Sequence, residues 1–177
     1  MGFTLANIGG RAALVKDGSW FDIARVSGGV LGPDPMSVVF GIGLNYQEHG
    51  EEASMEVPDN PVVFTKFPSC ITGPYDEVLM RSDRCDYEGE LVVVIGSGGK
   101  DISKADAWDH VLGLTAGQDI SDRAVQLASK PPHFDLGKSF DSFGPIGPVV
   151  VSVDQFTDRA NIRLRTLVND DERQNDT

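Results

Sequence analysis

Short apolar stretches separated by glycines open the chain. Residues 3–8 and 11–15 are rich in β-forming side chains, and Gly9-Gly10 joins them in a way typical of a two-residue β-hairpin. Residues 20–26 have the same character and predict a third strand. A run dense in glycine and proline follows. We therefore predict a small β-rich N-terminal lobe and linker over residues 1–36.

From residue 37 onward, apolar runs predict strands more often than helices. Residues 88–96 give the strongest strand pattern, an unbroken Val and Ile run preceded by acids. Further strands are predicted over residues 38–43, 61–64, 78–80, 112–118, 149–153 and 162–168.

Helices and turns are predicted at fewer places. Ser103-x-x-Asp106 has the shape of a capping box and predicts a helix start. A second helix is expected over residues 121–129, and residues 144–148 are expected to form a rigid turn. The expected fold class is α+β, mainly β, with residues 37–177 as one domain after the N-terminal lobe.

The acidic composition narrows the choice of partners. The 177 residues include 27 Asp and Glu against 15 Lys and Arg, which gives a net charge of −12. This charge disfavours nucleic acid and membrane surfaces as partners, because both need a positively charged protein face. No uncharged apolar run reaches the roughly 20 residues of a membrane helix, and no signal-peptide pattern is present. With only Cys70 and Cys85, we expect no disulfide framework and a cytoplasmic protein.

Two acidic residues stand at the start of the strongest predicted strand. Residues two apart in a strand point to the same face, so Glu88 and Glu90 are expected to project side by side. Asp119 follows another predicted strand, where a third carboxylate could converge with them. Carboxylate oxygens suit Mg²⁺, Mn²⁺ or Ca²⁺. Spacing alone, however, fits solvated acids at an exposed strand end better than a metal site.

His49 and Glu52 form a second candidate group. Their spacing of three residues places them on one face of a helical turn. A carboxylate that holds one imidazole nitrogen makes the other nitrogen a better base near neutral pH. Taken alone, an exposed histidine beside acidic residues is the simpler interpretation.

Five motifs follow one another in order along the chain. They are G-L-N-Y-x-x-H-x-x-E from Gly43 to Glu52, F-T-K from Phe64 to Lys66, D-Y-E-G-E-L from Asp86 to Leu91, Q-D-I-S-x-R from Gln118 to Arg123, and K-S-F-D-x-F-G-P-x-G-P from Lys138 to Pro148. This series resembles the catalytic domain of the fumarylacetoacetate hydrolase family over residues 38–177. The resemblance implies a mixed β-roll and β-sandwich with a few short helices.

The resemblance also implies a role for particular residues. Glu88, Glu90 and Asp119 match the family's metal carboxylates, which bind Mg²⁺ or Mn²⁺, with Ca²⁺ as a substitute. His49 and Glu52 match the pair that activates water, and Lys138 matches a lysine that stabilises developing negative charge. Substrate contacts are expected from Arg123, Gln126, Lys66 and Thr177. From the residues alone, Arg123 could equally form an ion pair with Asp119 or Asp122.

The expected function is that of a metal-dependent enzyme. The resemblance implies hydrolysis of a carbon–carbon bond in a β-diketo acid or acylpyruvate-type 2-oxo acid, with that small molecule as the partner. An oxaloacetate decarboxylase or a diene-dioate isomerase of the same family is the alternative. A catalytically inactive metal-binding or assembly remnant is an alternative of another class. The resemblance further implies a homodimer.

Two departures from the family pattern stand out. Pro35-Met36-Ser37 joins the lobe to the next strand abruptly, where family members have a longer segment. The last ten residues resemble the family's V-N-G-E-x-R-Q-x-x-x-T segment, with Asp170 in place of the usual Gly. Family members continue beyond it, so we expect the sequence to be incomplete at its C-terminal end and the substrate pocket to be affected.

Overall fold

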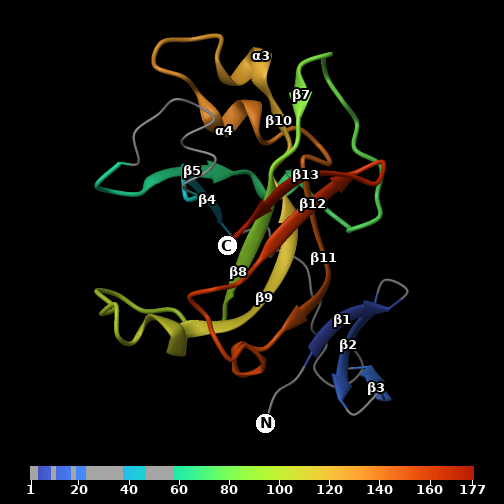
Figure 1. Cartoon of the computed structure of the whole chain (residues 1–177), viewed down its shortest axis with the longest axis vertical. Helices are drawn as coiled ribbons and strands as arrows, with labels where there is room; N and C mark the ends of the chain where they lie inside the picture. Colours follow the sequence, from blue (N-terminus) through green and yellow to red (C-terminus); the bar gives the residue numbers. More distant parts are fainter. Residues whose placement is uncertain (1–3, 9–10, 17–18, 23–37, 47–57) are drawn as a thin grey trace. The chain divides into compact units, whose positions relative to one another are not determined.

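A computed structural model describes residues 4–8, 11–16, 19–22, 38–46 and 58–177. The chain divides into two compact units (Figure 1). The sheet unit comprises Met1–Gly32, Leu91–Gly117 and Ile146–Asn161, and the site unit comprises Pro33–Glu90, Gln118–Pro145 and Ile162–Thr177. The residues discussed below as a candidate site all belong to the site unit.

The main sheet of the described residues has seven strands, six in the order β3-β2-β1-β11-β9-β8 and a seventh, β6 Ile71–Thr72, that pairs with β11. Their bounds are β1 Thr4–Ile8, β2 Arg11–Lys16, β3 Ser19–Asp22, β8 Gly89–Ile95, β9 Val111–Gln118 and β11 Gly144–Val151. The β-branched Val and Ile residues of β8, β9 and β11 favour this pleated arrangement. Leu114 on β9 is the most buried apolar side chain of the unit among the described residues, with 1% exposure.

The predicted N-terminal strands are confirmed as an antiparallel arrangement over residues 4–8, 11–16 and 19–22, whereas residues 23–26 of the third predicted strand lie outside the described residues. Thr4 pairs with Val15 across β1 and β2, and β2 continues into β3. On its other side β1 pairs with β11, with Thr4 opposite Val151. The predicted linker and the boundary at residue 36 lie outside the described residues, so the division into a lobe and a second domain stays a prediction.

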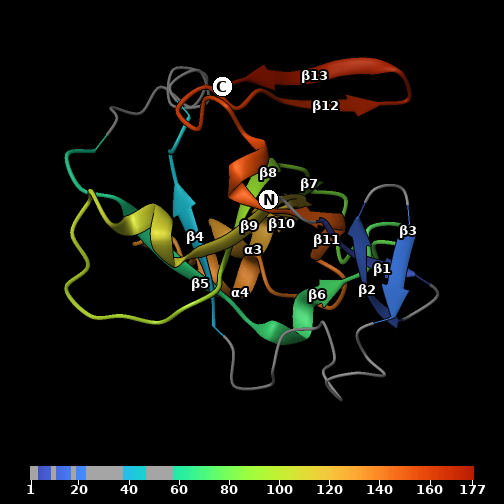
Figure 2. The same cartoon turned by 90° about the horizontal axis from the view of Figure 1, so that it is seen from below.

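The site unit contains shorter elements. Two strands, β4 Val39–Gly43 and β5 Val62–Lys66, form an antiparallel pair. The remaining elements are η1 Pro68–Cys70, β6 Ile71–Thr72, β7 Cys85–Asp86, β10 Ser121–Asp122, α3 Arg123–Gln126, α4 Phe134–Gly137, β12 Leu164–Val168 and β13 Asp171–Asp176. Figure 2 shows β12 and β13 as an antiparallel hairpin. Its turn residues Asn169 and Asp170 have positive φ angles of 51° and 70°, which Asn and Asp tolerate better than most residues.

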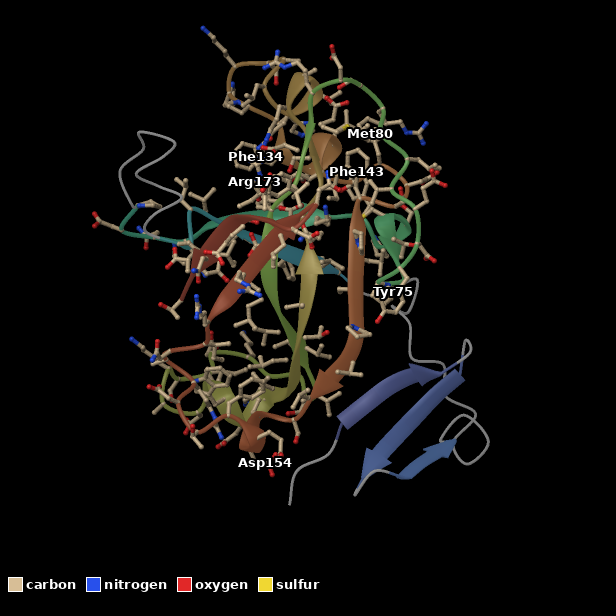
Figure 3. All side chains as sticks on the ribbon, turned by 45° about the vertical axis from the view of Figure 1, so that its right-hand side comes forward. Tyr75, Met80, Phe134, Phe143, Asp154 and Arg173 are labelled. Carbon is tan, nitrogen blue, oxygen red and sulfur yellow. The ribbon has the colours of Figure 1, made fainter. Side chains whose placement is uncertain are left out.

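A small aromatic core holds the site unit together. Phe64 on β5 meets Phe134 on α4 edge to face, with ring centroids 5.7 Å apart. Phe143, labelled in Figure 3, is fully buried just before β11. Gly41 on β4 lies opposite Phe64, and a Cβ there would come within 2.1 Å of the Phe64 ring. The absence of a side chain at residue 41 therefore lets β4 lie against this aromatic ring.

The fold class is confirmed as mainly β, but several local predictions are wrong. Residues 78–80 form no strand, and residues 144–148 begin β11 instead of forming a turn. Ser103 and Asp106 do bond to each other, yet they precede a 3₁₀ helix, η2 Ala107–His110, in place of an α-helix. A further 3₁₀ helix besides η1 and η2, η3 Val153–Gln155, follows β11.

The helix predicted over residues 121–129 is shorter than expected for a tertiary reason. Ser121 and Asp122 pair with Asp86 and Cys85 of β7, so the backbone is extended where the helix was to begin. Asp122 then caps α3 by accepting hydrogen bonds from the backbone of Ala124 and Val125. Strand pairing with a distant segment thus outweighs local helix propensity.

Candidate metal and substrate site

Two of the predicted metal carboxylates are joined through the backbone. Glu88 stands immediately before β8, and Asp119 stands immediately after β9. The backbone N–H of Asp119 donates to the carbonyl oxygen of Glu88 over 2.8 Å. The neighbouring ends of two strands therefore present both carboxylates in one region, as the sequence predicted.

Lys138 places its ammonium group between these two carboxylates. Its Nζ donates to Glu88 Oε2 at 3.1 Å, to Asp119 Oδ2 at 2.8 Å and to Ser121 Oγ at 2.7 Å. Lys138 is 2% exposed, so the charge is removed from water and is stabilised by these three acceptors. All three ammonium protons are used by the protein.

Lys66 supplies a second buried ammonium group from β5. Its Nζ lies 2.6 Å from Asp119 Oδ1 and 3.0 Å from the carbonyl oxygen of Phe143, and it also donates to the carbonyl oxygen of Lys138. Asp119 therefore lies between two lysines, one on each carboxylate oxygen. In this arrangement Lys66 has no proton left for a substrate.

Two side chains, those of Asp135 and Ser139, align the segments that carry these lysines. Asp135 on α4 accepts hydrogen bonds from the backbone and hydroxyl of Thr65, the latter over 2.8 Å. Ser139 Oγ accepts from the backbone N–H of Phe67 over 3.0 Å. These bonds involve neighbours of Lys66 and of Lys138, and so fix β5 against α4; the two elements lie next to each other in Figure 1.

Arg123 at the start of α3 is held by Asp86 and Glu88, which the sequence did not indicate as its partners. Its Nε and Nη2 donate to Asp86 Oδ2 at 3.0 and 2.7 Å. Nη2 also lies 2.7 Å from Glu88 Oε1, and Nη1 donates to Gln126 Oε1 at 2.9 Å. The ion pairs considered with Asp119 or Asp122 are therefore not the ones that form, because Asp119 pairs with lysines and Asp122 caps the helix.

Glu90 is the third predicted metal carboxylate, and its ionisation is unusual. Burial, followed by the negative charges of Glu88 and Asp119, raises the pKa of Glu90 to about 8, against the opposing effect of Lys138 and Lys66. Repulsion from the neighbouring carboxylates therefore contributes to the raised pKa of Glu90. In this structure the ammonium groups neutralise Glu88 and Asp119 directly, and they reach Glu90 less well.

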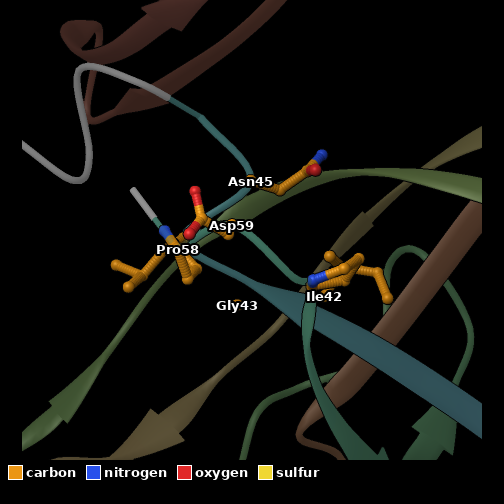
Figure 4. A pocket seen from close by; sticks show the side chains of 7 residues that line it. Ile42, Gly43, Asn45, Pro58 and Asp59 are labelled. Carbon is orange, nitrogen blue, oxygen red and sulfur yellow. The ribbon is translucent and has the colours of Figure 1, made fainter. Parts of the chain in front are cut away.

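The predicted His49–Glu52 pair lies outside the described residues, within 47–57. A hollow of about 210 Å³ lies where the chain enters and leaves that segment. Figure 4 shows Asn45, Pro58 and Asp59 among its lining side chains, with Ile42 and Gly43 at the end of β4. Thr177, which was predicted to contact the substrate, directly follows β13 and is exposed.

Comparison with known proteins decides the family. The profile for the fumarylacetoacetate (FAA) hydrolase C-terminal domain matches residues 38–177. The chain belongs to the fumarylacetoacetate hydrolase family. The predicted resemblance is thereby confirmed over the region in which it was recognised.

Individual members of the family are similar over most of this chain. The human protein named oxaloacetate tautomerase FAHD2A, mitochondrial, is 43% identical over 130 residues, covering 72% of this chain and 41% of its own length. A Dictyostelium discoideum protein named fumarylacetoacetate hydrolase domain-containing protein 2 homolog is 44% identical over 146 residues, covering 77% and 48%. The solved fumarylacetoacetate hydrolase of Exiguobacterium antarcticum has a TM-score of 0.77 and 30% identity, covering 99% of this chain and 74% of that one.

This chain thus spans about half the length of the curated relatives it matches, or somewhat less. One of them is named as mitochondrial, so the expectation of a cytoplasmic protein stays a prediction. Across the described segments, no helix is both long and apolar enough to cross a membrane. Cys70 and Cys85 are both free thiols, as expected.

The residues of this fumarylacetoacetate hydrolase family chain fit a divalent cation in charge and donor type. Glu88 and Asp119 already share one cation, the ammonium group of Lys138, and their hard oxygens are ligands that Mg²⁺ and Mn²⁺ prefer. In their present orientations, no three His, Cys, Asp or Glu side chains of the described residues form a metal-binding group. Binding a metal here therefore requires the Lys138 ammonium to give up its place between the two carboxylates.

Three features of the site were missed from the sequence. Asp86 lies two residues before Glu88 and therefore faces the same way, a signal that strand alternation could have supplied. Ser121 lies in the motif from Gln118 to Arg123, but the motif alone does not indicate that its hydroxyl accepts a hydrogen bond from Lys138. The contact of the β12–β13 hairpin with Gly89 had no local signal, because Gln174 is 85 residues away along the chain.

Proposed function

We propose that this chain carries the metal-dependent active site of an enzyme that forms and reprotonates the enolate of a 2-oxo acid. Keto–enol tautomerisation of oxaloacetate is the reaction we favour. The observation that carries this proposal is the buried pair of ammonium groups at Asp119, with Lys138 shared between Glu88 and Asp119. The name of the human relative, which is 43% identical over 130 residues, supports the choice of substrate.

Glu88, Glu90 and Asp119 are the residues that would hold Mg²⁺ or Mn²⁺, with Ca²⁺ as a substitute. A bound divalent cation supplies Lewis-acid stabilisation of an enolate oxygen. The protein's own contribution is the positive charge of Lys138, whose ammonium group leaves its place between Glu88 and Asp119 when a metal binds there. Lys138, desolvated at 2% exposure, is suited to stabilise negative charge on a substrate oxygen without reorganisation of water.

Arg123 and Gln126 are proposed to bind a substrate carboxylate. The Arg123 guanidinium is already oriented by Asp86 and Gln126, and such a planar fork suits a carboxylate. Lys66 and Thr177 remain proposed substrate contacts from the family resemblance. For Lys66 this contact requires an exchange of one of its three present acceptors. A homodimer likewise remains a proposal.

Hydrolysis of a carbon–carbon bond in an acylpyruvate is the second candidate. It is supported by the spacing of His49 and Glu52, which suits activation of water, and by the family's name. Both reactions pass through an enolate, so both need the same cationic site. They differ in whether water attacks a carbonyl. Decarboxylation, diene-dioate isomerisation and an inactive metal-binding remnant remain the further alternatives.

One set of assays separates these reactions. The full chain would be given oxaloacetate and acetylpyruvate with Mg²⁺, with Mn²⁺ or with a chelator. Loss of enol absorbance reports tautomerisation, and pyruvate release reports decarboxylation or hydrolysis. We expect metal-dependent tautomerisation that Glu88→Gln and Lys138→Met reduce at least about 100-fold.

His49→Ala tests the second candidate. Loss of acetylpyruvate hydrolysis with tautomerisation retained would assign His49 to water activation alone. Turnover that is insensitive to chelator and to Glu88→Gln would refute the metal-dependent proposal. No turnover with Mn²⁺ still bound would favour the inactive remnant. Arg165→Met, on the exposed face of the β12–β13 hairpin, is the control variant that should keep wild-type rates.

A further inference from the structure

The peptide group between Glu88 and Gly89 is held from both sides. Its carbonyl oxygen accepts a hydrogen bond from the backbone N–H of Asp119 over 2.8 Å. Its N–H donates to the side-chain Oε1 of Gln174 over 2.7 Å. One planar peptide unit therefore links Glu88 and Asp119 to Gln174, and Glu90 follows on the next peptide unit.

Gly89 leaves no room for a side chain on the face toward the hairpin. A Cβ at this residue would lie 2.0 Å from Thr166 Oγ1 and 3.1 Å from Gln174 Oε1. Thr166 is 8% exposed, and it pairs directly with Gln174 across β12 and β13. A cross-strand pair of side chains thus packs against the bare backbone of Gly89.

The direction of the side chains explains the consequence of this contact. Successive residues of a strand point to opposite faces, so the two glutamates point away from the face that Gly89 would fill. Thr166 and Gln174 therefore touch the backbone behind the glutamates instead of the carboxylates themselves. A shift of this peptide would move Glu88 and Glu90 together, and would break the bond to Asp119.

We propose that Gln174 and Thr166 are positioning residues. They hold Glu88 and Glu90 in place through their contacts with the backbone of Gly89. The proposal rests on the proposed function, because it assigns these carboxylates to a metal. Partners that orient metal ligands without touching the metal commonly change metal affinity about 10- to 100-fold when they are removed. A merely structural contact would lower the stability of the hairpin without that selective effect.

The first test removes only the acceptor on Gln174. Gln174→Met has similar length and no acceptor for the Gly89 N–H, whereas Gln174→Glu keeps an acceptor oxygen. Arg173→Met is the control, because Arg173 is the neighbouring residue of β13 and its side chain is 51% exposed. Mn²⁺ affinity would be measured by calorimetry. Unfolding in chelator and amide hydrogen exchange of Gly89 and Asp119 would be measured on the same variants.

We expect Gln174→Met to weaken Mn²⁺ binding at least about tenfold. The Gly89 and Asp119 amides should exchange faster in this variant, because the peptide that both bonds share is loosened. Gln174→Glu should restore the protection of the Gly89 amide, and Arg173→Met should match the unsubstituted chain. The midpoint of unfolding in chelator should change far less than the Mn²⁺ affinity.

The second test uses the missing side chain of Gly89. Gly89→Ala should displace the peptide and weaken Mn²⁺ binding, because its Cβ would meet Thr166 Oγ1. Thr166→Ala removes that oxygen and leaves its own Cβ 3.4 Å away, an ordinary contact. The double variant should therefore bind Mn²⁺ more tightly than Gly89→Ala alone. Failure of Thr166→Ala to rescue would overturn the positioning role of Thr166.

Two outcomes keep this proposal distinct from the proposed function. Unchanged Mn²⁺ affinity and unchanged amide exchange in Gln174→Met would overturn the positioning role while the metal site stands. Absence of Mn²⁺ binding by the unsubstituted chain would refute the metal site. The amide exchange rates would then decide the positioning role. If the Gly89 amide and the Asp119 amide each exchanged at the same rate in every variant as in the unsubstituted chain, that role would be refuted as well.

Discussion

Two sets of ion pairs in the site unit contain similar chemical groups in opposite surroundings. Around Asp119, Lys66 and Lys138 have side chains that are 6% and 3% exposed, and they lie within 2.8 Å of a carboxylate oxygen. On the β12–β13 hairpin, Arg165 and Glu172 lie 3.6 Å apart with side chains 52% and 45% exposed. The first set has lost its water, and the second has kept it.

The difference shows which charged side chains cannot be substituted without a large loss of stability. A buried ion pair has already lost its hydration, so removal of one partner leaves an uncompensated charge. An exposed pair exchanges its partner for water at little cost. Chemistry that depends on a fixed charge is therefore expected at Asp119, and the hairpin pairs are expected to be replaceable.

The largest predicted effect is that of Lys66→Met. The change leaves one oxygen of Asp119 without its cation and the buried carbonyl oxygen of Lys138 without its ammonium donor, whereas the carbonyl oxygen of Phe143 keeps the backbone N–H of Ile120. We expect a loss of about 3–5 kcal/mol in the free energy of unfolding. Urea unfolding in the presence of chelator measures it. A loss under about 1 kcal/mol would show that the buried and exposed pairs do not differ as described.

The second prediction concerns pH and Glu90. Its pKa is raised to about 8 from the ordinary 4.5, so the folded chain keeps a proton that the unfolded chain releases over this interval. Stability in chelator should therefore fall as pH rises from about 4.5 to about 8, by at most about 1.4 kcal/mol per pH unit from this group. It should level off above that range.

Glu90→Gln provides the check on this slope. Chemical unfolding of both forms across the pH range would be compared, and the variant should show a flatter profile. Glu172→Gln, an exposed acid on the hairpin, should leave the slope as it is. Parallel profiles for the unsubstituted chain and Glu90→Gln would contradict the assignment of the slope to Glu90.

The smallest predicted effect is at the hairpin itself. Arg165→Met removes the partner of Glu172 on an exposed surface, so we expect a change of only about 0.2–1 kcal/mol in the free energy of unfolding. The effect should shrink further at high salt, since exposed charges are screened. A cost comparable to that of Lys66→Met would remove the contrast between the two regions.

Some parts of the site could be predicted from the sequence because their signals are local. Glu88 and Glu90 are two residues apart at the start of β8, Glu88 directly before the strand and Glu90 within it, so strand alternation predicts a common direction for them. The apolar run of β8 and the antiparallel pairing of β1 with β2 were predictable for the same reason. Order along the chain was also sufficient to recognise the family over residues 38–177.

Other predictions failed or remained open because the deciding partner is distant in sequence. Residues 121 and 122 are extended, since they pair with β7, and residues 144–148 are a strand, since they pair with β6 and β9. A run of Gly and Pro predicts a turn only where no neighbouring strand forms hydrogen bonds with its backbone. His49 and Glu52 lie outside the described residues, so their pairing stays a prediction.

The sequence by itself determined the family, the mainly β class and the residues that supply the carboxylates. Only the tertiary structure decided what surrounds those carboxylates. It placed Lys66 and Lys138 on the two oxygens of Asp119 and directed Arg123 to Asp86. It also brought Gln174 to the backbone of Gly89. Local periodicity fixes the direction of a side chain, whereas burial and partners depend on segments that meet only when the chain has folded.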